Sequence, residues 1–352
     1  MTGPEPRAAL LDRIQAGGPC YVIAEAGSNH NGDLELALRL IGVAADAGAD
    51  AVKFQLFRAA KLYPRAAGSA DYLRGDEDIY DLIERMELPL EWLPQLSAAA
   101  ADAGVDFIVS PFDEQSADAV DPYVPAFKLA SYELTHHPLL RHIAAKGKPL
   151  LMSTGAADLA EVREAIEVAR AAGNERIVVL QCTAAYPAPI EALNVSALAT
   201  LRSELGTPVG LSDHSSHPVI APVMAVALGA SVIEKHFTLD RALPGPDHRF
   251  ALEPDELVRM IEAIRQAEKA LGSGRKEVLP EEQELREFAR RSVFAIRDIP
   301  AGSELDEGSL AVLRAGARGH GVDPADLERL LGRRARRPIE ADAPIHWEDV
   351  EE

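Results

Sequence analysis

Cysteine and aromatic residues are scarce in this chain, and long apolar runs are missing. Its 352 residues include 2 cysteines, Cys20 and Cys182, and 5% aromatic side chains. Two cysteines exclude a disulfide framework and lack metal-ligand spacing, so we interpret both as small buried hydrophobic residues and favour neither as a nucleophile. No stretch approaches the roughly 18 consecutive apolar residues of a membrane helix, and no secretory signal pattern opens the chain. We therefore expect a cytoplasmic protein.

Basic residues are outnumbered by acidic ones. The chain has 36 lysines and arginines against 56 aspartates and glutamates, which gives a formal charge of −20. Such a charge repels nucleic acid and anionic membranes, so we expect neither as a partner, and an anionic substrate must be captured by a local positive site. We interpret the one basic run, at 333–337, as a solvated face or a subunit contact.

Apolar strand-like runs alternate with amphipathic helical stretches along most of the chain. Eight such units in about 270 residues match the size of a (β/α)₈ TIM barrel in the α/β class. A doubly wound open sheet is the alternative, because periodicity alone does not establish closure. The expected strands are Tyr21 to Glu25, Ala51 to Leu56, Asp106 to Ser110, Ala126 to Ala130, Pro149 to Met152, Ile177 to Leu180, Pro208 to Leu211 and Ser231 to Lys235.

The pattern predicts four segments. Residues 1–20 form an N-terminal lead-in, and residues 21–271 form the barrel domain. Residues 272–290 begin with a Gly- and Ser-rich stretch and continue as a charged helix, which indicates a linker. Residues 291–352 carry short strands and turns, and we expect a small β-rich domain that is marginal alone.

Two histidines follow directly after predicted strands. His214 ends Gly-Leu-Ser-Asp-His, and His236 lies in Ile-Glu-Lys-His-Phe-Thr-Leu-Asp-Arg. Consecutive strand ends can bring two imidazoles to one divalent metal ion, and imidazole ligands favour Mn²⁺ over Mg²⁺. These histidines are therefore the candidate metal ligands.

Polar side chains recur where the other predicted strands end. A single serine at a strand end is usually a turn or cap residue, and a single lysine usually reaches the surface. Lys53 and Lys128, however, lie inside apolar strands, where a buried ammonium needs a partner charge. We therefore predict an anion site for a phosphate and a neighbouring carboxylate. The strand-end candidates are Glu25, Lys53, Ser110, Lys128, Ser131, Ser153, Ser212 and Glu234.

Several long motifs follow one another along the chain, namely Ile-Ala-Glu-Ala-Gly-Ser-Asn-His-Asn-Gly-Asp, Gly-Ala-Asp-Ala-Val-Lys-Phe-Gln, Ser-Pro-Phe-Asp, Phe-Lys-Leu-Ala-Ser, Ser-Thr-Gly and Glu-Lys-His-Phe-Thr-Leu-Asp-Arg. In this order they resemble the N-acetylneuraminate (sialic acid) synthase family, and within it they look most like the spore coat polysaccharide synthase branch. The segment that begins Arg-Ser-Val-Phe-Ala-Ile-Arg-Asp-Ile-Pro-Ala-Gly resembles the antifreeze-like SAF domain of that family.

The resemblance implies condensation of phosphoenolpyruvate with an open-chain N-acylated amino sugar, such as N-acetylmannosamine, to a 2-keto-3-deoxy nonulosonic acid and phosphate. It assigns Lys53, Ser110, Lys128, Ser131, Ser153 and Ser212 to phosphoenolpyruvate. Glu25 and Glu234 are the candidates for proton transfer or for orienting metal-bound water. The sugar would contact Tyr186, Asp247 and Phe288, together with Arg314 of the partner subunit in a domain-swapped homodimer.

Several positions depart from the family pattern and leave the acceptor sugar open. Gln181 replaces a histidine, which removes a polar group expected near a substrate, and Tyr132 replaces a common glycine. Arg74 stands where a sugar-contacting asparagine is usual, and Ala315 replaces a proline. A diacetamido-trideoxyhexose, giving legionaminic-like products, therefore competes with N-acetylmannosamine.

Two functions from other classes remain open. A Schiff-base aldolase on the same barrel would use Lys53 or Lys128 as its nucleophile and would need that lysine neutral. A non-catalytic carbohydrate-binding protein would use its small domain to bind glycan, although such a protein has no physical need for two buried lysines beside a histidine pair.

Overall fold

Parallel strands β1 through β8 close into a barrel, since β8 pairs with β1. The computed structural model describes residues 10–15, 18–69 and 78–351, and within them each barrel strand also pairs with the next in the chain. The closure confirms the predicted TIM barrel and excludes the open doubly wound sheet. The strands are β1 (Tyr21–Gly27), β2 (Ala51–Leu56), β3 (Asp106–Pro111), β4 (Phe127–Leu129), β5 (Leu150–Ser153), β6 (Ile177–Cys182), β7 (Val209–Asp213) and β8 (Val232–His236).

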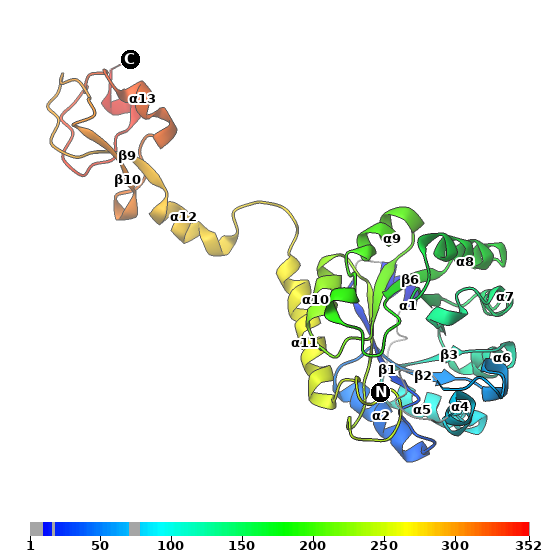
Figure 1. The fold of residues 1–352 in the computed structure, drawn as a ribbon. Helices are drawn as coiled ribbons and strands as arrows, with labels where there is room; N and C mark the ends of the chain where they lie inside the picture. The colour runs from blue at the N-terminus through cyan, green and yellow to red at the C-terminus, as the bar shows by residue number, and fades with distance from the viewer. Residues whose placement is uncertain (1–9, 16–17, 70–77, 352) are drawn as a thin grey trace, which may run out of the picture. The chain divides into compact units, whose positions relative to one another are not determined.

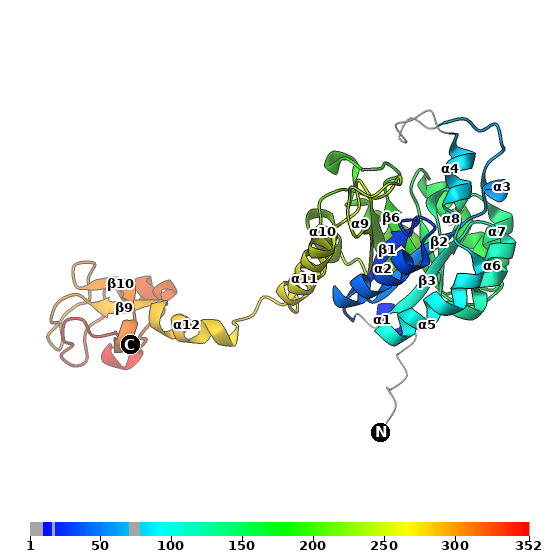
Figure 2. The ribbon, with the colours of Figure 1, turned by 90° about the horizontal axis from the view of Figure 1, so that it is seen from below.

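Helices surround this barrel (Figures 1 and 2). Two of the long helices, α2 and α8, start at the side-chain caps Asp33 and Asp158. The Asp158 carboxylate accepts from the backbone N–H of Glu161, and the Glu161 carboxylate accepts from the backbone N–H of Asp158. Such reciprocal capping satisfies backbone groups that a helix start leaves without partners. The helices are α2 (Leu34–Asp46), α3 (Ala59–Leu62), α4 (Ile79–Arg85), α5 (Leu93–Ala103), α6 (Glu114–Val120), α7 (His137–Ala144), α8 (Leu159–Ala171), α9 (Ala197–Leu205), α10 (Ile220–Ala227) and α11 (Pro254–Leu271).

The strands bury both faces, so the barrel has an inner and an outer apolar layer. Leu211 and Ile233 belong to the outer layer beneath the helices, whereas Leu180 and Val232 belong to the inner one. This division follows from the alternation of side chains along a strand. The same alternation decides which strand-end residues face the mouth of the barrel.

A short helix, α1 (Leu10–Gln15), adds to the inner layer. Leu10, Leu11 and Ile14 are buried in one cluster with inner barrel residues such as Tyr21. The sequence predicts a lead-in over 1–20, and the described helix of that segment contributes apolar packing to the barrel interior. Residues 1–9 and 16–17 of that segment lie outside the described residues, as does Arg74.

The chain divides into two compact units, Met1–Gly272 and Ser273–Glu352. The second unit contains helices α12 (Gln283–Ala289) and α13 (Leu327–Leu330) and an antiparallel pair of strands, β9 (Arg291–Ala295) and β10 (Leu310–Arg314). Its small core is apolar and includes Val293, Leu305, Leu330 and Ile345. This arrangement agrees with the small β-rich domain that the sequence predicts.

Within the described ranges, no helix combines the length and apolar character that crossing a bilayer requires.

Gly210 in β7 provides a test of how tightly the barrel interior is filled. A Cβ atom added there would lie 2.4 Å from the Val232 carbonyl oxygen and 2.6 Å from a methyl carbon of Leu180. We expect Gly210→Ala to lower the free energy of unfolding by about 1–3 kcal/mol in urea denaturation, because an overpacked core must shift. Gly42→Ala in α2 is the control, since nothing lies within 4 Å of its Cβ. The control should gain up to about 1 kcal/mol, and equal behaviour of the two variants would contradict this account.

Candidate active site

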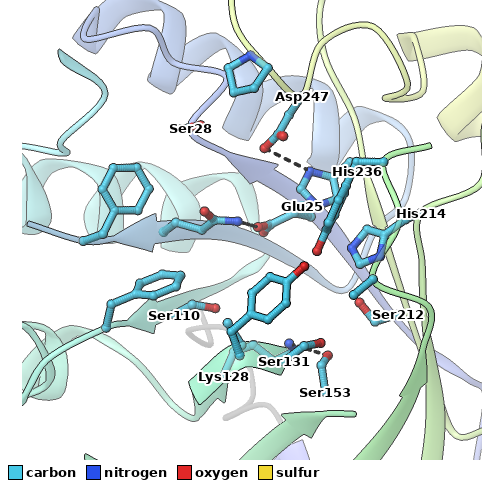
Figure 3. A pocket seen from close by; sticks show the side chains of 18 of the residues that line it. Glu25, Ser28, Ser110, Lys128, Ser131, Ser153, Ser212, His214, His236 and Asp247 are labelled. Atoms are coloured by element: carbon cyan, nitrogen blue, oxygen red, sulfur yellow. Dashed lines mark hydrogen bonds and ion pairs between the residues drawn. The ribbon is translucent and has the colours of Figure 1, made fainter. Parts of the chain in front are cut away.

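A cavity of about 530 Å³ opens at the carboxyl ends of the barrel strands. It gathers residues that are far apart in the sequence, because parallel strands deliver their last side chains to one end of a barrel. The predicted site residues that line it are Glu25, Lys53, Ser110, Lys128, Ser131, Ser153, Tyr186, Ser212, His214, Glu234, His236 and Asp247. Figure 3 shows Asp247, His236 and His214 along one side of this cavity, with Lys128, Ser131 and Ser153 beneath them.

Lys53 is buried on the floor of the cavity and is paired with carboxylates. Its Nζ atom lies 2.8 Å from Oε1 of Glu25 and 3.9 Å from Oε2 of Glu234, and it donates to Ser110 Oγ at 3.1 Å. Burial alone would lower the pKa of Lys53, but Glu234 and Glu25 raise it above its usual value. Lys53 is therefore a fixed positive charge.

Lys128 lies beside it with fewer charge partners. Its Nζ atom donates to Ser153 Oγ at 2.7 Å and lies 3.5 Å from Oε1 of Glu234. Burial lowers the pKa of Lys128 in spite of the attraction of Glu234. The two lysines thus differ in how firmly they hold their protons, although both aim ammonium groups and hydroxyl partners into one cavity.

The two glutamates of this cluster also differ. Burial raises the pKa of Glu25, whereas Lys128 and Lys53 overcome burial and lower the pKa of Glu234. Ser212 donates to Glu234 Oε1 at 3.0 Å, and the Oε2 atom of each glutamate is buried without a hydrogen bond from the described residues. Two carboxyls whose pKa values are moved apart suit opposite roles as acid and base.

His214 and His236 lie next to each other with ring centroids 5.4 Å apart. A ligating nitrogen lies about 2.1 Å from a metal ion, so this separation lets both imidazoles reach one ion. The Nδ1 atom of His214 donates to the Thr183 carbonyl at 3.0 Å, which leaves its Nε2 as the available ligand. Burial holds the pKa of His236 well below its usual value, so this imidazole is neutral, as a ligand must be.

Asp247 lies next to His236 on the same side of the cavity. Its Oδ2 atom lies 3.7 Å from His236 Nδ1, which is itself buried without a hydrogen bond in the described part of the chain. Burial and the nearby Glu25 raise the pKa of Asp247 to about 6. The donors present therefore fit a divalent ion held by two imidazoles, with remaining positions for water or substrate. A group of three or more His, Cys, Asp or Glu side chains arranged to hold a metal is absent from the described ranges.

The structure adds contacts that the sequence analysis missed. Gln55 lies two residues after Lys53 on β2 and donates to Glu25 Oε1 at 2.9 Å, so its position could have been read from the period of the strand. Cys182, interpreted as a small buried hydrophobic residue, is indeed buried, but its Sγ also lies 3.6 Å from His214 Nδ1. An apolar wall of the cavity comes from outside the strands and consists of Phe57, Tyr63, Ile83, Met86 and Phe112.

Three other positions from the sequence analysis can now be located, although the predicted sugar contacts of Phe288 and Arg314 stay predictions. Gln181 stands where the family pattern has a histidine expected near a substrate, but it does not line the cavity, and its amide donates to the Leu193 carbonyl at 3.3 Å. The reason is strand alternation, since its neighbour Cys182 takes the inward position on β6. Phe288 and Arg314 lie in the second unit, where both side chains are exposed.

Comparison with known proteins identifies relatives over nearly the whole chain. Residues 40–276 match the NeuB family, and residues 290–351 match the SAF domain. The spore coat polysaccharide biosynthesis protein SpsE of Bacillus subtilis is 44% identical over 349 residues, which cover 94% of each chain. The N,N'-diacetyllegionaminic acid synthase of Legionella pneumophila is 40% identical over 360 residues, which cover 100% of this chain and 98% of that one. The crystal structure of the Bacillus subtilis SpsE aligns with a TM-score of 0.64 at 42% identity, covering 95% and 96% of the two chains.

Glu133 is a buried carboxyl next to the cavity wall, and it predicts a pH effect on stability. Burial raises its pKa to about 7 from the usual 4.5, and its Oε2 accepts no hydrogen bond from the described residues. Below pH 4.5 the carboxyl is protonated in both the folded and the unfolded chain, so it has no pH-linked effect. As pH rises from 4.5 through 7, only the unfolded chain ionises freely, and the folded state loses stability.

We therefore expect Glu133→Gln to raise the free energy of unfolding at pH 8 by up to about 3 kcal/mol, and to have little pH-linked effect at pH 4. Urea denaturation at the two pH values measures the difference. The exposed Glu204, which pairs with Arg163 on the surface, serves as the control for Glu→Gln exchange. A Glu133→Gln effect that is the same at both pH values would contradict the shifted pKa.

Proposed function

This chain belongs to the NeuB family and carries a SAF domain, and from that premise we propose that it condenses phosphoenolpyruvate with an open-chain N-acylated amino sugar. The products would be a 2-keto-3-deoxy nonulosonic acid of the sialic acid type and inorganic phosphate. The observation that carries the proposal is the paired set of Lys53 and Lys128 with their serine partners, buried beside two adjacent imidazoles.

Phosphoenolpyruvate is a small, dense anion, and the floor of the cavity supplies what it needs. Two ammonium groups with hydroxyl neighbours can bind phosphate and carboxylate oxygens through charge-assisted hydrogen bonds. Ser110 and Ser153 already accept from these lysines, and Ser131 Oγ accepts from the backbone N–H of Gly155 at 3.0 Å. The serines are thus oriented before substrate arrives, which reduces the ordering that binding requires.

His214 and His236 would hold the divalent ion, for which we propose Mn²⁺, with Asp247 next to His236. When bound, such an ion supplies Lewis-acid polarisation of the acceptor aldehyde. The Thr183 carbonyl keeps the His214 ring in one tautomer, and Phe250 contacts the His236 ring with centroids 5.2 Å apart. These neighbours orient the imidazoles at the edge of the cavity floor, where phosphoenolpyruvate would bind.

The atoms of the reaction balance with one water molecule. C3 of phosphoenolpyruvate forms a bond to the aldehyde carbon, whose oxygen becomes a hydroxyl by gaining a proton. Water then adds at C2 and loses one proton, which leaves a hydroxyl there. As the bond between C2 and the ester oxygen breaks, that hydroxyl gives its proton to the departing phosphate and becomes the keto oxygen. We assign Glu25, with its raised pKa, as the proton donor, and Glu234, with its lowered pKa, as the group that accepts a proton from the attacking water.

For the acceptor we propose a diacetamido-trideoxyhexose ahead of N-acetylmannosamine. An aldehyde next to His214 on β7 directs the far end of the sugar across the mouth, toward the side of β3, because these strands face each other in the closed ring. On that side lie Phe57, Met86 and Phe112, which offer apolar surface. A 6-methyl group and an acetamido methyl lose less by burial there than a hydroxymethyl group, whose hydroxyl would lack a partner.

Phosphate release tests this function. Full-length protein with phosphoenolpyruvate and Mn²⁺ should release phosphate with 2,4-diacetamido-2,4,6-trideoxymannose more efficiently than with N-acetylmannosamine. With pyruvate in place of phosphoenolpyruvate, it should form no sugar acid. A chelator or His236→Ala should abolish release while the fold persists by circular dichroism. Full activity of His236→Ala with metal retained would end the metal assignment.

The Schiff-base aldolase is the second candidate, because burial lowers the pKa of Lys128 as such a nucleophile requires. Borohydride with pyruvate separates the two functions. We expect no covalent adduct by mass spectrometry, and an adduct on Lys128 together with chelator-resistant activity would favour the aldolase.

We also propose that the protein acts as a domain-swapped homodimer in which Arg314 reaches the sugar of the partner's site. Arg314→Ala should then weaken use of the sugar more than use of phosphoenolpyruvate in steady-state kinetics. At a sugar concentration at which Arg314→Ala alone has little activity, mixing it with inactive His236→Ala should restore about a quarter of the wild-type activity, because random pairing completes about one site in four. The exposed Arg318 provides a matched Arg→Ala control. Absence of complementation, or equal effects on both substrates, would contradict the assignment.

A further inference from the structure

A buried ion pair lies behind the two histidines, on the opposite face of the strands. Asp213 of β7 and Lys235 of β8 are each 1% exposed, and Lys235 Nζ lies 2.5 Å from Asp213 Oδ2. The two residues are register partners in the sheet. Because side chains alternate along a strand, Asp213 and Lys235 point away from the cavity that His214 and His236 line.

The same pair holds the chain on the far side of His214. Asp213 Oδ1 accepts from the Ser215 backbone N–H at 2.8 Å, and Lys235 Nζ donates to the Ser215 carbonyl at 2.5 Å. Lys235 is itself the residue before His236. One ammonium group, on the residue next to His236, therefore binds the Asp213 side chain before His214 and the Ser215 carbonyl after it.

Stability alone does not explain an ion pair at this position. Its neighbours on the outer face of the barrel, Leu211, Ile233 and Phe237, are apolar and buried. Removing two charges from water costs several kcal/mol, and well-packed apolar residues in place of a buried ion pair are often as stable. Hydrophobic packing would hold the helices on this face equally well, whereas it would not bind both the N–H and the carbonyl of Ser215.

We propose that the Asp213–Lys235 pair is a positioning device that sets the separation and orientation of His214 and His236. The inference rests on the proposed function in so far as the two imidazoles hold a divalent ion. Neither residue touches the cavity, so both act through the backbone of the histidines. Groups that orient metal ligands typically change metal affinity about 10–100-fold when they are removed.

Lys235→Met in the full-length protein tests the proposal, with two readouts. The Mn²⁺ dissociation constant, measured from the electron paramagnetic resonance signal of free Mn²⁺, should rise about 10–100-fold. Hydrogen exchange measured by mass spectrometry should become faster in the peptide that spans 211–218. Asp213→Asn should have a smaller effect on both, because an asparagine oxygen can still accept from the Ser215 N–H.

Arg265→Met is the matched control. It breaks an ion pair with Asp50 at 3.1 Å and a bond to the Cys20 carbonyl, at the amino end of the barrel strands. We expect this variant to lose stability while it keeps wild-type Mn²⁺ affinity and wild-type exchange at 211–218. If Lys235→Met does not fold, the double variant Asp213→Asn/Lys235→Met, which leaves no unpaired charge, takes its place.

Lys235→Met with the Mn²⁺ affinity and local exchange of the Arg265→Met control would overturn the positioning role. Failure of the proposed function has a different signature, namely a wild-type protein that binds Mn²⁺ no better than His236→Ala. In that case Mn²⁺ affinity is uninformative, and hydrogen exchange alone tests the positioning role. Faster exchange at 211–218 in Lys235→Met, but not in Arg265→Met, supports the positioning role, and unchanged exchange refutes it.

Discussion

Mutual neutralisation of buried charges at the mouth of the barrel is the constraint on which the site depends. Lys53, Lys128, Glu25 and Glu234 have almost no exposure, and any one of them left unpaired would cost several kcal/mol. Separate strands carry them, so the closed barrel must hold those strand ends within a few tenths of an ångström. The pairing also supports the proposed anion site, since the phosphate of phosphoenolpyruvate would take the place of carboxylates as a partner of ammonium groups that are already desolvated.

Strands β7 and β8 carry charged side chains on their outer faces, whereas the described outer faces of β1 to β5 are apolar and that of β6 adds the uncharged Gln181. Inside, Ser212 donates to Glu234, and outside, Lys235 binds Asp213. Each polar pair is a register partner across the same two strands. Because these contacts are directional, they restrict sliding and rotation of the strand ends more than apolar packing does. The proposed metal site would need that restriction, because two imidazoles that share one ion must keep a fixed separation.

The sequence predicts the barrel well, because eight apolar runs separated by amphipathic helices leave few alternative folds. Only the closure of the sheet, through pairing of β8 with β1, could not be read from the sequence. The strand-end rule also places most candidate residues in one cavity, although their chemical roles stay predictions. Its failures have physical reasons. The position of Gln181 was expected near a substrate but faces away, because adjacent residues of a strand face opposite ways, whereas Gln55 was overlooked although residues two apart on a strand share a face. The role of α1 was missed because a helix of one or two turns has too little periodicity to reveal which surface it covers. The burial of Glu133 depends on tertiary contacts that no local pattern contains.

Under the proposed function, chemistry and acceptor choice come from different parts of this chain. The charged floor is built from strands, which the closed hydrogen-bonded ring holds in place, whereas Ile83 and Met86 of the apolar wall come from α4 and the residue that follows it. Loops and short helices tolerate substitution that strands paired on both edges do not. A change of acceptor would therefore require new residues in these loops and short helices, while the lysines, glutamates and histidines of the cavity stay unchanged. On this division of labour, Tyr132, which is exposed at the rim where the family commonly has glycine, belongs with the wall that selects the sugar.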